Sequence, residues 1–208
     1  MTSILLQGFE AIALAIDDPE EKLIISEVSW EQYEHLLAHL GDSDRYRITY
    51  FDGILEIMSP SRRHEVDKKS AARLLEVYLE EAEIDFWGLG STTFRKQKQE
   101  VGKEPDECYC IGTEKEFPDI AIEVVLTSGG INFLEVYKRL EVKEVWFWQN
   151  NQLTIYHLSE SGEYEQQTAS TLLPNLDITL LSQYVTVTNP RLAMQQFRAK
   201  VRASLGKF

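Results

Sequence analysis

The sequence predicts an α/β protein in which β-hairpins alternate with amphipathic helices. Two observations support this fold class: turn signals such as Asp52-Gly53 between apolar runs, and apolar residues at helical spacing across residues 61–83. With 208 residues, the chain is long enough for one sizeable core. A single domain is therefore favoured, and two small domains stay open.

The first half of the chain carries the clearest local signals. Ser29 followed by Gln32 has the capping-box pattern that begins a helix. Asp52-Gly53 is the strongest short-range hairpin signal, and Ser59-Pro60 supplies an N-cap and a first-turn proline. The predicted elements are a strand at 23–28, a helix from Ser29, a hairpin of 45–51 with 54–58, and a helix at 61–83.

The second half repeats this alternation of strands and helices. Gly129-Gly130 interrupts the chain before a helix, and Asn150-Asn151 divides the two strands of a further hairpin. The predicted strands are 85–87, 92–99, 106–111, 119–125, 144–148, 153–158 and 164–168, and the predicted helices are 132–140 and 190–205.

The charge balance bears on the partners of the protein. Thirty-four acidic and twenty-one basic residues give a net charge of −13, which repels nucleic acid unless Lys and Arg gather locally. Such clusters occur at Arg62-Arg63, Lys68-Lys69, residues 95–98 and near the carboxyl end. A solvated helix or strand face is the simpler interpretation of each cluster.

Several residues bear on compartment and metal content. The sequence shows neither a secretory signal nor a membrane span, so we expect a cytoplasmic protein with no membrane partner. Cys108 and Cys110 alternate along a predicted strand and are expected as buried thiols. His35 and His39 stand one helical turn apart, but a zinc site that combines them with the cysteines lacks credible ligand geometry.

Two predicted strands, 106–111 and 119–125, carry the acidic residues that point to chemistry. If they pair about a turn centred between Glu114 and Lys115, Asp106 stands opposite Glu123, with Cβ atoms ~4.5–5.5 Å apart. Two carboxylates this close can share a divalent cation, and without a cation or a proton they repel. Asp119 lies roughly 13 Å along the strand from Glu123, too far to share the ion, so we expect it to start the strand.

Structural roles stay open for these acids. Asp106 can cap a loop, and Glu123 can pair with a lysine or arginine of the long helix. Glu65, near the start of that helix, can reach the same centre as a third carboxylate beside His64. Alternatively, Glu65 pairs at the surface with a lysine three or four residues later.

Short motifs in a fixed order resemble one family. They are Met58-Ser59-Pro60-Ser61 with His64, Glu104-Pro105-Asp106, the run from Phe117 to Val125, and Tyr137 through Trp146. Across residues 26–181 the chain resembles the Uma family, restriction-endonuclease-like proteins within the PD-(D/E)XK nuclease superfamily. No single motif is specific, whereas their order and spacing are.

The resemblance implies a restriction-endonuclease-like fold, with a mixed central sheet flanked by helices and additional β-hairpins. The active site would lie where two strands of the sheet diverge. We accordingly expect residues 1–25 as an N-terminal extension, 26–188 as the nuclease-like domain and 189–208 as a C-terminal amphipathic helix.

The resemblance also implies the site and the reaction. Asp106, Glu123 and the Val124 carbonyl match the ligands of Mg2+ (or Mn2+), and Glu65 matches the helix carboxylate. The implied reaction is in-line hydrolysis of a DNA phosphodiester, in which the cation and a lysine stabilise the charge that develops on phosphate.

The chain departs from the family pattern at the lysine. The usual Glu-x-Lys motif would place it at Val125, and family members often place it four residues before the tyrosine matching Tyr137, at Phe133. Lys138 lies ~140° around the helix from that position. We therefore expect an impaired nuclease with weakened or absent cleavage. The alternative is an inactive nuclease-fold module that binds DNA or a protein partner.

The oligomeric state is suggested only indirectly. Trp146, Phe147 and Trp148 are consecutive, so they cannot all face one core, and one aromatic side is left for a helix or a partner. Because nucleases that cut both strands often act as dimers, a homodimer stays open by analogy.

Overall fold

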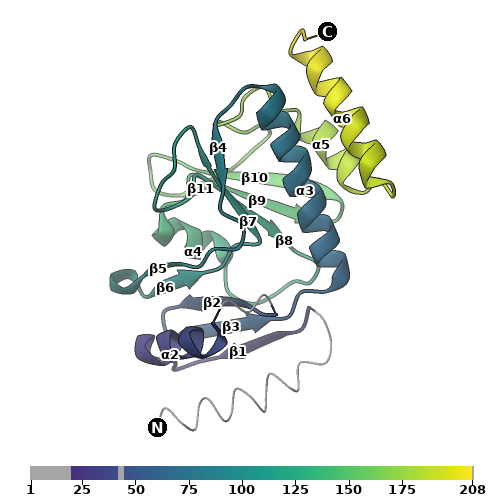
Figure 1. Cartoon of the computed structure of the whole chain (residues 1–208). Helices are drawn as coiled ribbons and strands as arrows, with labels where there is room; N and C mark the ends of the chain where they lie inside the picture. Colours follow the sequence, from purple (N-terminus) through teal and green to yellow (C-terminus); the bar gives the residue numbers. More distant parts are fainter. Residues whose placement is uncertain (1–19, 42–44, 208) are drawn as a thin grey trace. The chain divides into compact units, whose positions relative to one another are not determined.

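The computed structural model describes residues 20–41 and 45–207, which divide into two compact units (Figure 1). Each unit is assembled from three separate segments of the chain and has a β-sheet of its own. Within the described residues, unit 1 comprises 20–41, 45–61, 93–104 and 127–140, and unit 2 comprises 62–92, 105–126 and 141–207.

Unit 1 contains a five-stranded antiparallel sheet. In sheet order, its strands are β1 (Lys22–Ile25), β3 (Ile54–Met58), β2 (Arg47–Phe51), β6 (Val101–Lys103) and β5 (Phe94–Lys96). Asp52 and Gly53 form the turn between β2 and β3, and both have the positive φ that this two-residue turn requires. The hairpin predicted at this place is confirmed.

Among its described residues, unit 1 has the α-helices α2 (Trp30–Leu40) and α4 (Phe133–Leu140), together with the short 3-10 helix η1 (Gln97–Gln99). At the start of α2, the Ser29 hydroxyl accepts a hydrogen bond from the Gln32 amide, and the Gln32 side chain accepts one from the Ser29 amide. The capping box predicted from the sequence is confirmed.

Aromatic rings fix α2 on its sheet. The Tyr33 and Tyr50 rings stack with centroids 4.8 Å apart, and the Trp30 ring meets both edge to face. Gly102 in β6 is needed beneath them, because a Cβ atom there would lie 2.1 Å from the Tyr33 hydroxyl. The close approach of helix and sheet therefore depends on a glycine at this position.

Unit 2 contains a six-stranded mixed sheet. In sheet order, its strands are β11 (Tyr164–Gln167), β10 (Gln152–Leu158), β9 (Glu144–Gln149), β8 (Ile120–Val124), β7 (Glu107–Ile111) and β4 (Phe86–Gly88). The pair β8–β9 is parallel and the other pairs are antiparallel. The predicted α/β class with a mixed sheet is confirmed.

Three helices cover the sheet of unit 2, namely α3 (Arg62–Glu81), α5 (Ile178–Val185) and α6 (Pro190–Ser204). The long helix α3 packs on strand β8 and against α5 and α6 (Figure 1). The core between them combines Leu74 and Tyr78 of α3 with Ile122, Val124 and Trp146 of the sheet, all at most 4% exposed. The face of β8 that carries Ile122 and Val124 thus packs beneath a helix.

Some predicted elements differ in length from the observed ones. The strand expected at 92–99 ends at Lys96, because the next three residues form η1. The helix α5 was not predicted; Asp177 caps it by accepting a hydrogen bond from the Leu180 amide. Of the N-terminal extension expected at 1–25, residues 1–19 lie outside the described residues, and β1 pairs with β3.

Two further observations concern the chain as a whole. Across residues 20–41 and 45–207, no helix combines the length and the hydropathy that crossing a membrane requires.

Cys108 and Cys110 are free and buried, as the sequence predicts, and burial raises the pKa of both thiols.

Candidate active site

The register of β7 and β8 brings two acidic residues to one place. Glu107 pairs with Ile122 and Tyr109 with Ile120, which is the register predicted from the sequence. Continued by one step beyond Glu107, the same register would set Asp106 opposite Glu123. Both acids are 2% exposed, so two buried acids lie where the hairpin ends.

Asp106 is held in place by the strand opposite and by a helix. Its Oδ2 atom accepts a hydrogen bond of 2.8 Å from the Val124 amide. Its Oδ1 atom lies 2.8 Å from Nε2 of His64, which is fully buried in the first turn of α3. These contacts from two directions fix the orientation of the carboxylate.

Glu123 faces the same side of the sheet as its partner. It lies on β8, where it pairs with Phe147 of the parallel strand β9. Burial is the main cause that raises the pKa of the Cys108 thiol, and the negative charge of Glu123 adds to it. Because side chains alternate along strands, Asp106, Cys108 and Glu123 share one face.

Asp119, at the other end of β8, has a structural environment. Its Oδ2 atom accepts hydrogen bonds from the Lys115 ammonium and, at 2.8 Å, from the Ile111 amide, and its Oδ1 lies 2.9 Å from Lys143 Nζ. Burial alone would raise the pKa of Asp119, but hydrogen bonds from Lys115, the Ile111 amide and Lys143 outweigh it and lower the pKa. Asp119 therefore anchors the start of the strand.

The first turns of α3 place Glu65 and His64 differently. Glu65 Oε2 lies 2.6 Å from Lys68 Nζ, one turn later, and 38% of the Glu65 side chain is exposed. The helix side chain that meets Asp106 is His64, which the sequence marked only as part of a motif. The position of His64 in the first turn of the helix, next to Glu65, is the sequence signal that could have assigned it to the candidate site.

A second contact holds α3 over the ends of the central strands. Asp67 Oδ2 accepts a hydrogen bond of 3.2 Å from the Trp148 indole, at the end of β9. The same oxygen accepts one of 2.8 Å from Nε of Arg63. Because Asp67 follows His64 by three residues, both side chains leave the helix on one face. The helix thus carries two buried polar contacts to the sheet at the candidate site.

The donor chemistry of this site fits a hard divalent cation. Asp106 and Glu123 offer carboxylate oxygens, and the Val124 carbonyl would add a neutral oxygen, the ligand type that Mg2+ and Mn2+ prefer. Among the described residues, no group of three or more His, Cys, Asp or Glu side chains gathers as a metal cage. A magnesium ion needs no such cage, because it usually keeps several of its waters.

In unit 1, Phe133 begins α4 at the position where the family resemblance leads one to expect a lysine. Two lysine ammoniums lie over its ring: Lys103 Nζ is 3.9 Å from the ring centroid and Lys22 Nζ is 5.5 Å from it. The position of the missing lysine is thus occupied by a ring that faces cations from two strands.

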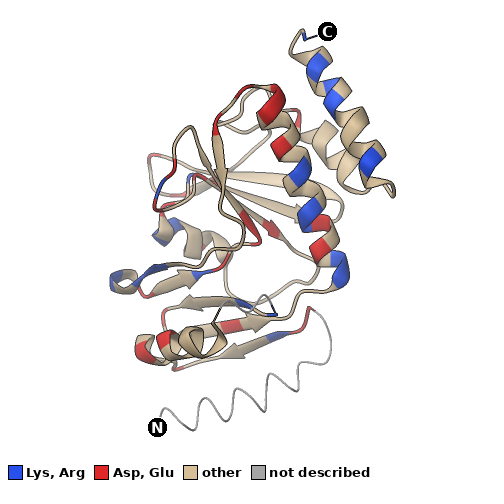
Figure 2. Cartoon of the chain, in the orientation of Figure 1, with Lys and Arg blue, Asp and Glu red and all other residues tan. Residues whose placement is uncertain are grey.

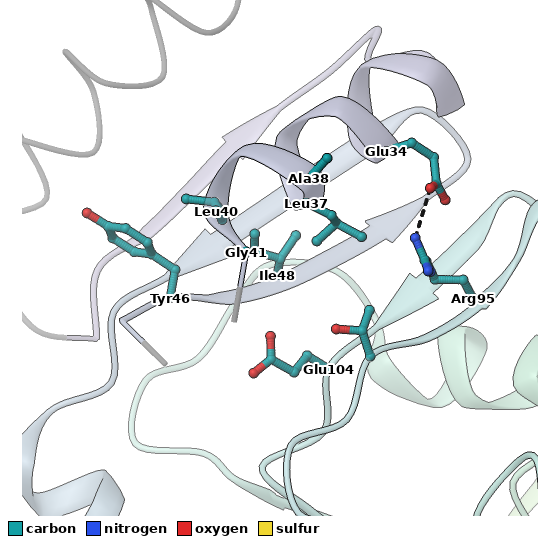
Figure 3. Close-up of a pocket in the computed structure, with 10 residues that line it drawn as sticks. Glu34, Leu37, Ala38, Leu40, Gly41, Tyr46, Ile48, Arg95 and Glu104 are labelled. Carbon is teal, nitrogen blue, oxygen red and sulfur yellow. Dashed lines mark hydrogen bonds and ion pairs between the residues drawn. The ribbon is translucent and has the colours of Figure 1, made fainter. Parts of the chain in front are cut away.

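Unit 1 also contains a pocket of about 290 Å3 that the sequence did not predict (Figure 3). Leu37, Leu40 and Ile48 form its apolar wall, and Arg95 and Glu34 form an ion pair of 2.8 Å at its edge. It contains none of the predicted site residues.

Comparisons with known proteins define the family. A model of the Uma2 family, described as "Putative restriction endonuclease", matches residues 30–189, which is more than half of the chain. The chain belongs to the Uma2 family. The resemblance noted from the sequence motifs is therefore confirmed.

A solved structure shows the same fold. It is the crystal structure of a protein from Anabaena variabilis ATCC 29413, described as a putative nuclease belonging to DUF820. The TM-score is 0.51 at 13% sequence identity, and the match covers 76% of this Uma2 chain and 99% of the other. A search among curated proteins found no match to the chain.

Proposed function

We propose that this Uma2 protein is a magnesium- or manganese-dependent endonuclease that hydrolyses DNA phosphodiesters. Asp106 and Glu123 would be its central carboxylates, and Glu65 a third carboxylate supplied by α3. The facing pair of buried acids at the ends of β7 and β8 carries the proposal. Burying two like charges together is unfavourable, and a bound cation would offset their repulsion.

Asp106, Glu123 and the Val124 carbonyl are the residues that would hold the metal. A divalent cation bound to them would polarise the phosphate and lower the pKa of the attacking water. Val124 would thus serve twice, because its amide already donates to Asp106 Oδ2 at 2.8 Å.

In the reaction, a bond forms between the water oxygen and phosphorus as the bond from phosphorus to the leaving sugar oxygen breaks. The water gives up one proton and the sugar oxygen gains one, so one strand end carries a phosphomonoester and the other a hydroxyl. His64, 2.8 Å from Asp106, positions that carboxylate before DNA arrives. Catalysis of this kind depends mainly on positioning and electrostatic stabilisation.

DNA is the proposed partner despite the net charge of −13. Basic residues recur along α3 in unit 2, the helix that carries His64 and Glu65, with acidic residues between and after them (Figure 2). Four of them are exposed, namely Arg62, Arg63, Lys69 and Arg73. A local basic surface of this kind can bind phosphates on a protein that is acidic overall.

Compartment and assembly form part of the same proposal. The free thiols of Cys108 and Cys110 fit a reducing compartment, and we propose the cytoplasm. Cutting both strands would require two active sites, which a homodimer would provide. Sedimentation of the protein with and without duplex DNA measures that assembly.

The rival candidate is a binding module that keeps the nuclease fold without cleavage. The observation that favours it is the pair Val125 and Phe133, which occupy the two positions where the family pattern leads one to expect the lysine. Salt-dependent retention of DNA without cleavage would support this candidate. Failure to bind DNA at any salt concentration would point to a protein partner.

Plasmid cleavage tests the proposed function. Supercoiled DNA is incubated with the protein and Mg2+ or Mn2+, beside Asp106→Ala and beside Glu114→Gln, an exposed acid in the turn of the same hairpin. We expect the wild type and the Glu114 variant to cut at equal rates, weakened by the missing lysine, and Asp106→Ala to lose about 10³-fold in rate. Equal rates for Asp106→Ala and wild type would refute the site, and absence of cutting by all three would favour the binding module.

A further inference from the structure

Helices α3, α5 and α6 of unit 2 meet around a pocket of about 160 Å3. Most of its wall is apolar and consists of Val66, Leu74, Tyr184, Val187, Pro190, Ala193 and Met194. None of these residues belongs to the candidate active site. Val66 follows His64 by two residues and therefore lies ~200° around α3 from it. The pocket is thus a separate feature on another face of the helix.

The pocket has the size of one side chain. Sites for small molecules usually begin at about 300 Å3, whereas an apolar cavity of about 150 Å3 accommodates one benzene ring. A single Phe or Leu side chain would therefore fill it. Val66 is 51% exposed, so the apolar surface continues from the pocket to solvent. An exposed apolar surface beside polar residues is typical of an interaction site.

The helices around the pocket are basic. The lining includes Lys69 and Arg73, both exposed, and no acidic residue. Although the whole chain has a net charge of −13, residues 178–208 contain no Asp or Glu. Their basic residues, some of which Figure 2 shows on α6, are Arg191, Arg198, Lys200, Arg202 and Lys207. Negative charge on an occupant is therefore favoured here.

The cations differ in how far the chain itself neutralises them. Arg198 and Arg202 of α6 both pair with Glu81 of α3. Lys69 Nζ lies 2.7 Å from Glu107 of β7. Arg73 is accordingly the cation of the lining that we select for testing.

We propose that the pocket between α3, α5 and α6 is the docking site of an acidic amphipathic segment of a partner protein. An apolar side chain of that segment would fill the pocket, and its carboxylates would meet Arg73 and Lys69. An amphipathic helix laid in an apolar groove is a recurring mode of recognition. The inference goes beyond the proposed nuclease function and does not rest on it.

DNA is the rival occupant, because Lys69 and Arg73 also belong to the basic surface proposed for DNA. Phosphates would use these cations and leave the apolar wall without a partner. An unstacked base would need hydrogen bonds at its polar edges. Of the uncharged residues in the lining, only Ser70 and Tyr184 have polar side chains, and the Ser70 hydroxyl already donates to the Val66 carbonyl at 2.8 Å. An apolar side chain fits this wall better.

A second copy of the chain is a weaker candidate for the occupant. In a two-fold dimer the same patch of each copy meets itself. Two basic patches would then face each other and repel. Charge therefore favours a different, acidic partner.

The chain offers a matched control for each part of the site. Val66 lines the pocket, whereas Leu192 of α6, 40% exposed, lies outside the lining. Arg73 lines it too, whereas Lys200 of α6 is an exposed cation outside it. The variants are Val66→Ser with Leu192→Ser, and Arg73→Gln with Lys200→Gln. Because all four side chains are exposed, each variant should fold, and melting curves check this.

The experiment selects binders to the full chain from a displayed library of random peptides about 15 residues long, enough for about four helical turns. We expect the enriched peptides to combine Asp and Glu with a Leu or Phe anchor. Fluorescence anisotropy then measures their affinity for wild type and the four variants. Val66→Ser should weaken binding about tenfold and Arg73→Gln about fivefold at low salt, and both controls should stay within about twofold.

Three further results would overturn the inference. The first is a library without enriched peptides, or with peptides that lack acids or bind Val66→Ser as tightly as wild type. The second is duplex or single-stranded DNA that loses as much affinity in Val66→Ser as the peptides do, which would assign the pocket to a base. The third is self-association, measured by sedimentation, that Val66→Ser abolishes. Plasmid cleavage is scored separately, so its absence would count against the nuclease function alone.

Discussion

The two ends of strand β8 both carry buried acids, and their surroundings differ. At its start, Asp119 meets the ammoniums of Lys115 and Lys143 and the Ile111 amide, and its pKa is lowered. At its end, Glu123 comes opposite Asp106, a second carboxylate. Both ends are equally buried, so burial alone does not distinguish a structural acid from a functional one.

The identity of the partners makes the distinction. Glu144 in β9 extends the structural group: its carboxylate accepts hydrogen bonds from the Trp146 indole, the Ser170 hydroxyl, the Thr171 amide and hydroxyl, and the Leu172 amide. An acid neutralised or solvated by the chain itself stabilises the fold. An acid placed against another acid is stabilised once a cation arrives.

The largest effect is expected at the facing pair. We expect Glu123→Gln to reduce cleavage by about 10³-fold, equivalent to about 4 kcal/mol in the barrier, because one ligand charge is lost. If Glu123 stands opposite Asp106, as the register of the two strands predicts, the melting temperature without metal should stay the same or rise, since one of two like charges is removed. Melting curves with and without Mn2+ check this: a variant that is strongly destabilised without metal would assign Glu123 to the structural group.

The next largest effect is expected at Glu144, and on stability alone. Glu144→Ala leaves several buried donors without an acceptor, so unfolding by urea should show a loss of about 3 kcal/mol. Cleavage per folded molecule should not change. A loss below about 0.5 kcal/mol would mean that the donors find other acceptors, and that the Glu144 carboxylate contributes little to the stability of the fold.

Asp119→Asn should be milder. The amide oxygen can still accept from the Ile111 amide, and the two lysines, of which 36% and 55% of the side chain are exposed, can turn to water. We expect a loss of about 2 kcal/mol in urea unfolding and unchanged metal binding. A lost Mn2+ shift would instead bring Asp119 back as a candidate ligand.

The smallest effect is expected at Glu81 on α3, and it depends on pH. Hydrogen bonds from Arg202 and Arg198 of α6 lower its pKa from 4.5 to about 2. Because the pKa is lower in the folded state, the stabilisation is present above pH 4.5 and is lost as pH falls toward about 2. Glu81→Gln should lose about 1 kcal/mol at pH 7, and the gap to wild type should close in acid. A gap independent of pH would contradict this explanation.

Local signals in the sequence predicted most of the fold. Asp52-Gly53 and Ser29 with Gln32 specify a turn and a cap through bonds within a few residues, so the structure reproduces both. The same holds for the register of β7 and β8, which depends on one turn. The sequence favours a single domain and does not predict the two compact units. Each unit joins three segments that are distant in the chain, and no local sequence pattern specifies such an assembly.

For the candidate site, too, the sequence predicts the local features and not the contacts that depend on tertiary packing. Strand alternation and one turn were enough to predict the register of β7 and β8, from which the facing of Asp106 and Glu123 is proposed. The contact between His64 and Asp106 depends on the rotation of α3 about its axis over the sheet, which local sequence signals do not specify. The buried hydrogen bond between Asp67 of α3 and Trp148 of β9 likewise joins residues far apart in sequence. The Lys103 ammonium over Phe133 likewise depends on packing between β6 and α4.

The register at the end of β7 also constrains which insertions and deletions the gene can tolerate. The turn between Ile111 and Ile120 lies outside the paired strands, so its length can change while the ladder stays intact. A single residue inserted between Asp106 and Cys108 would instead turn the Asp106 side chain to the opposite face of the sheet. Length variation among relatives should therefore be common in the turn and absent from β7 (Glu107–Ile111), the strand that follows Asp106.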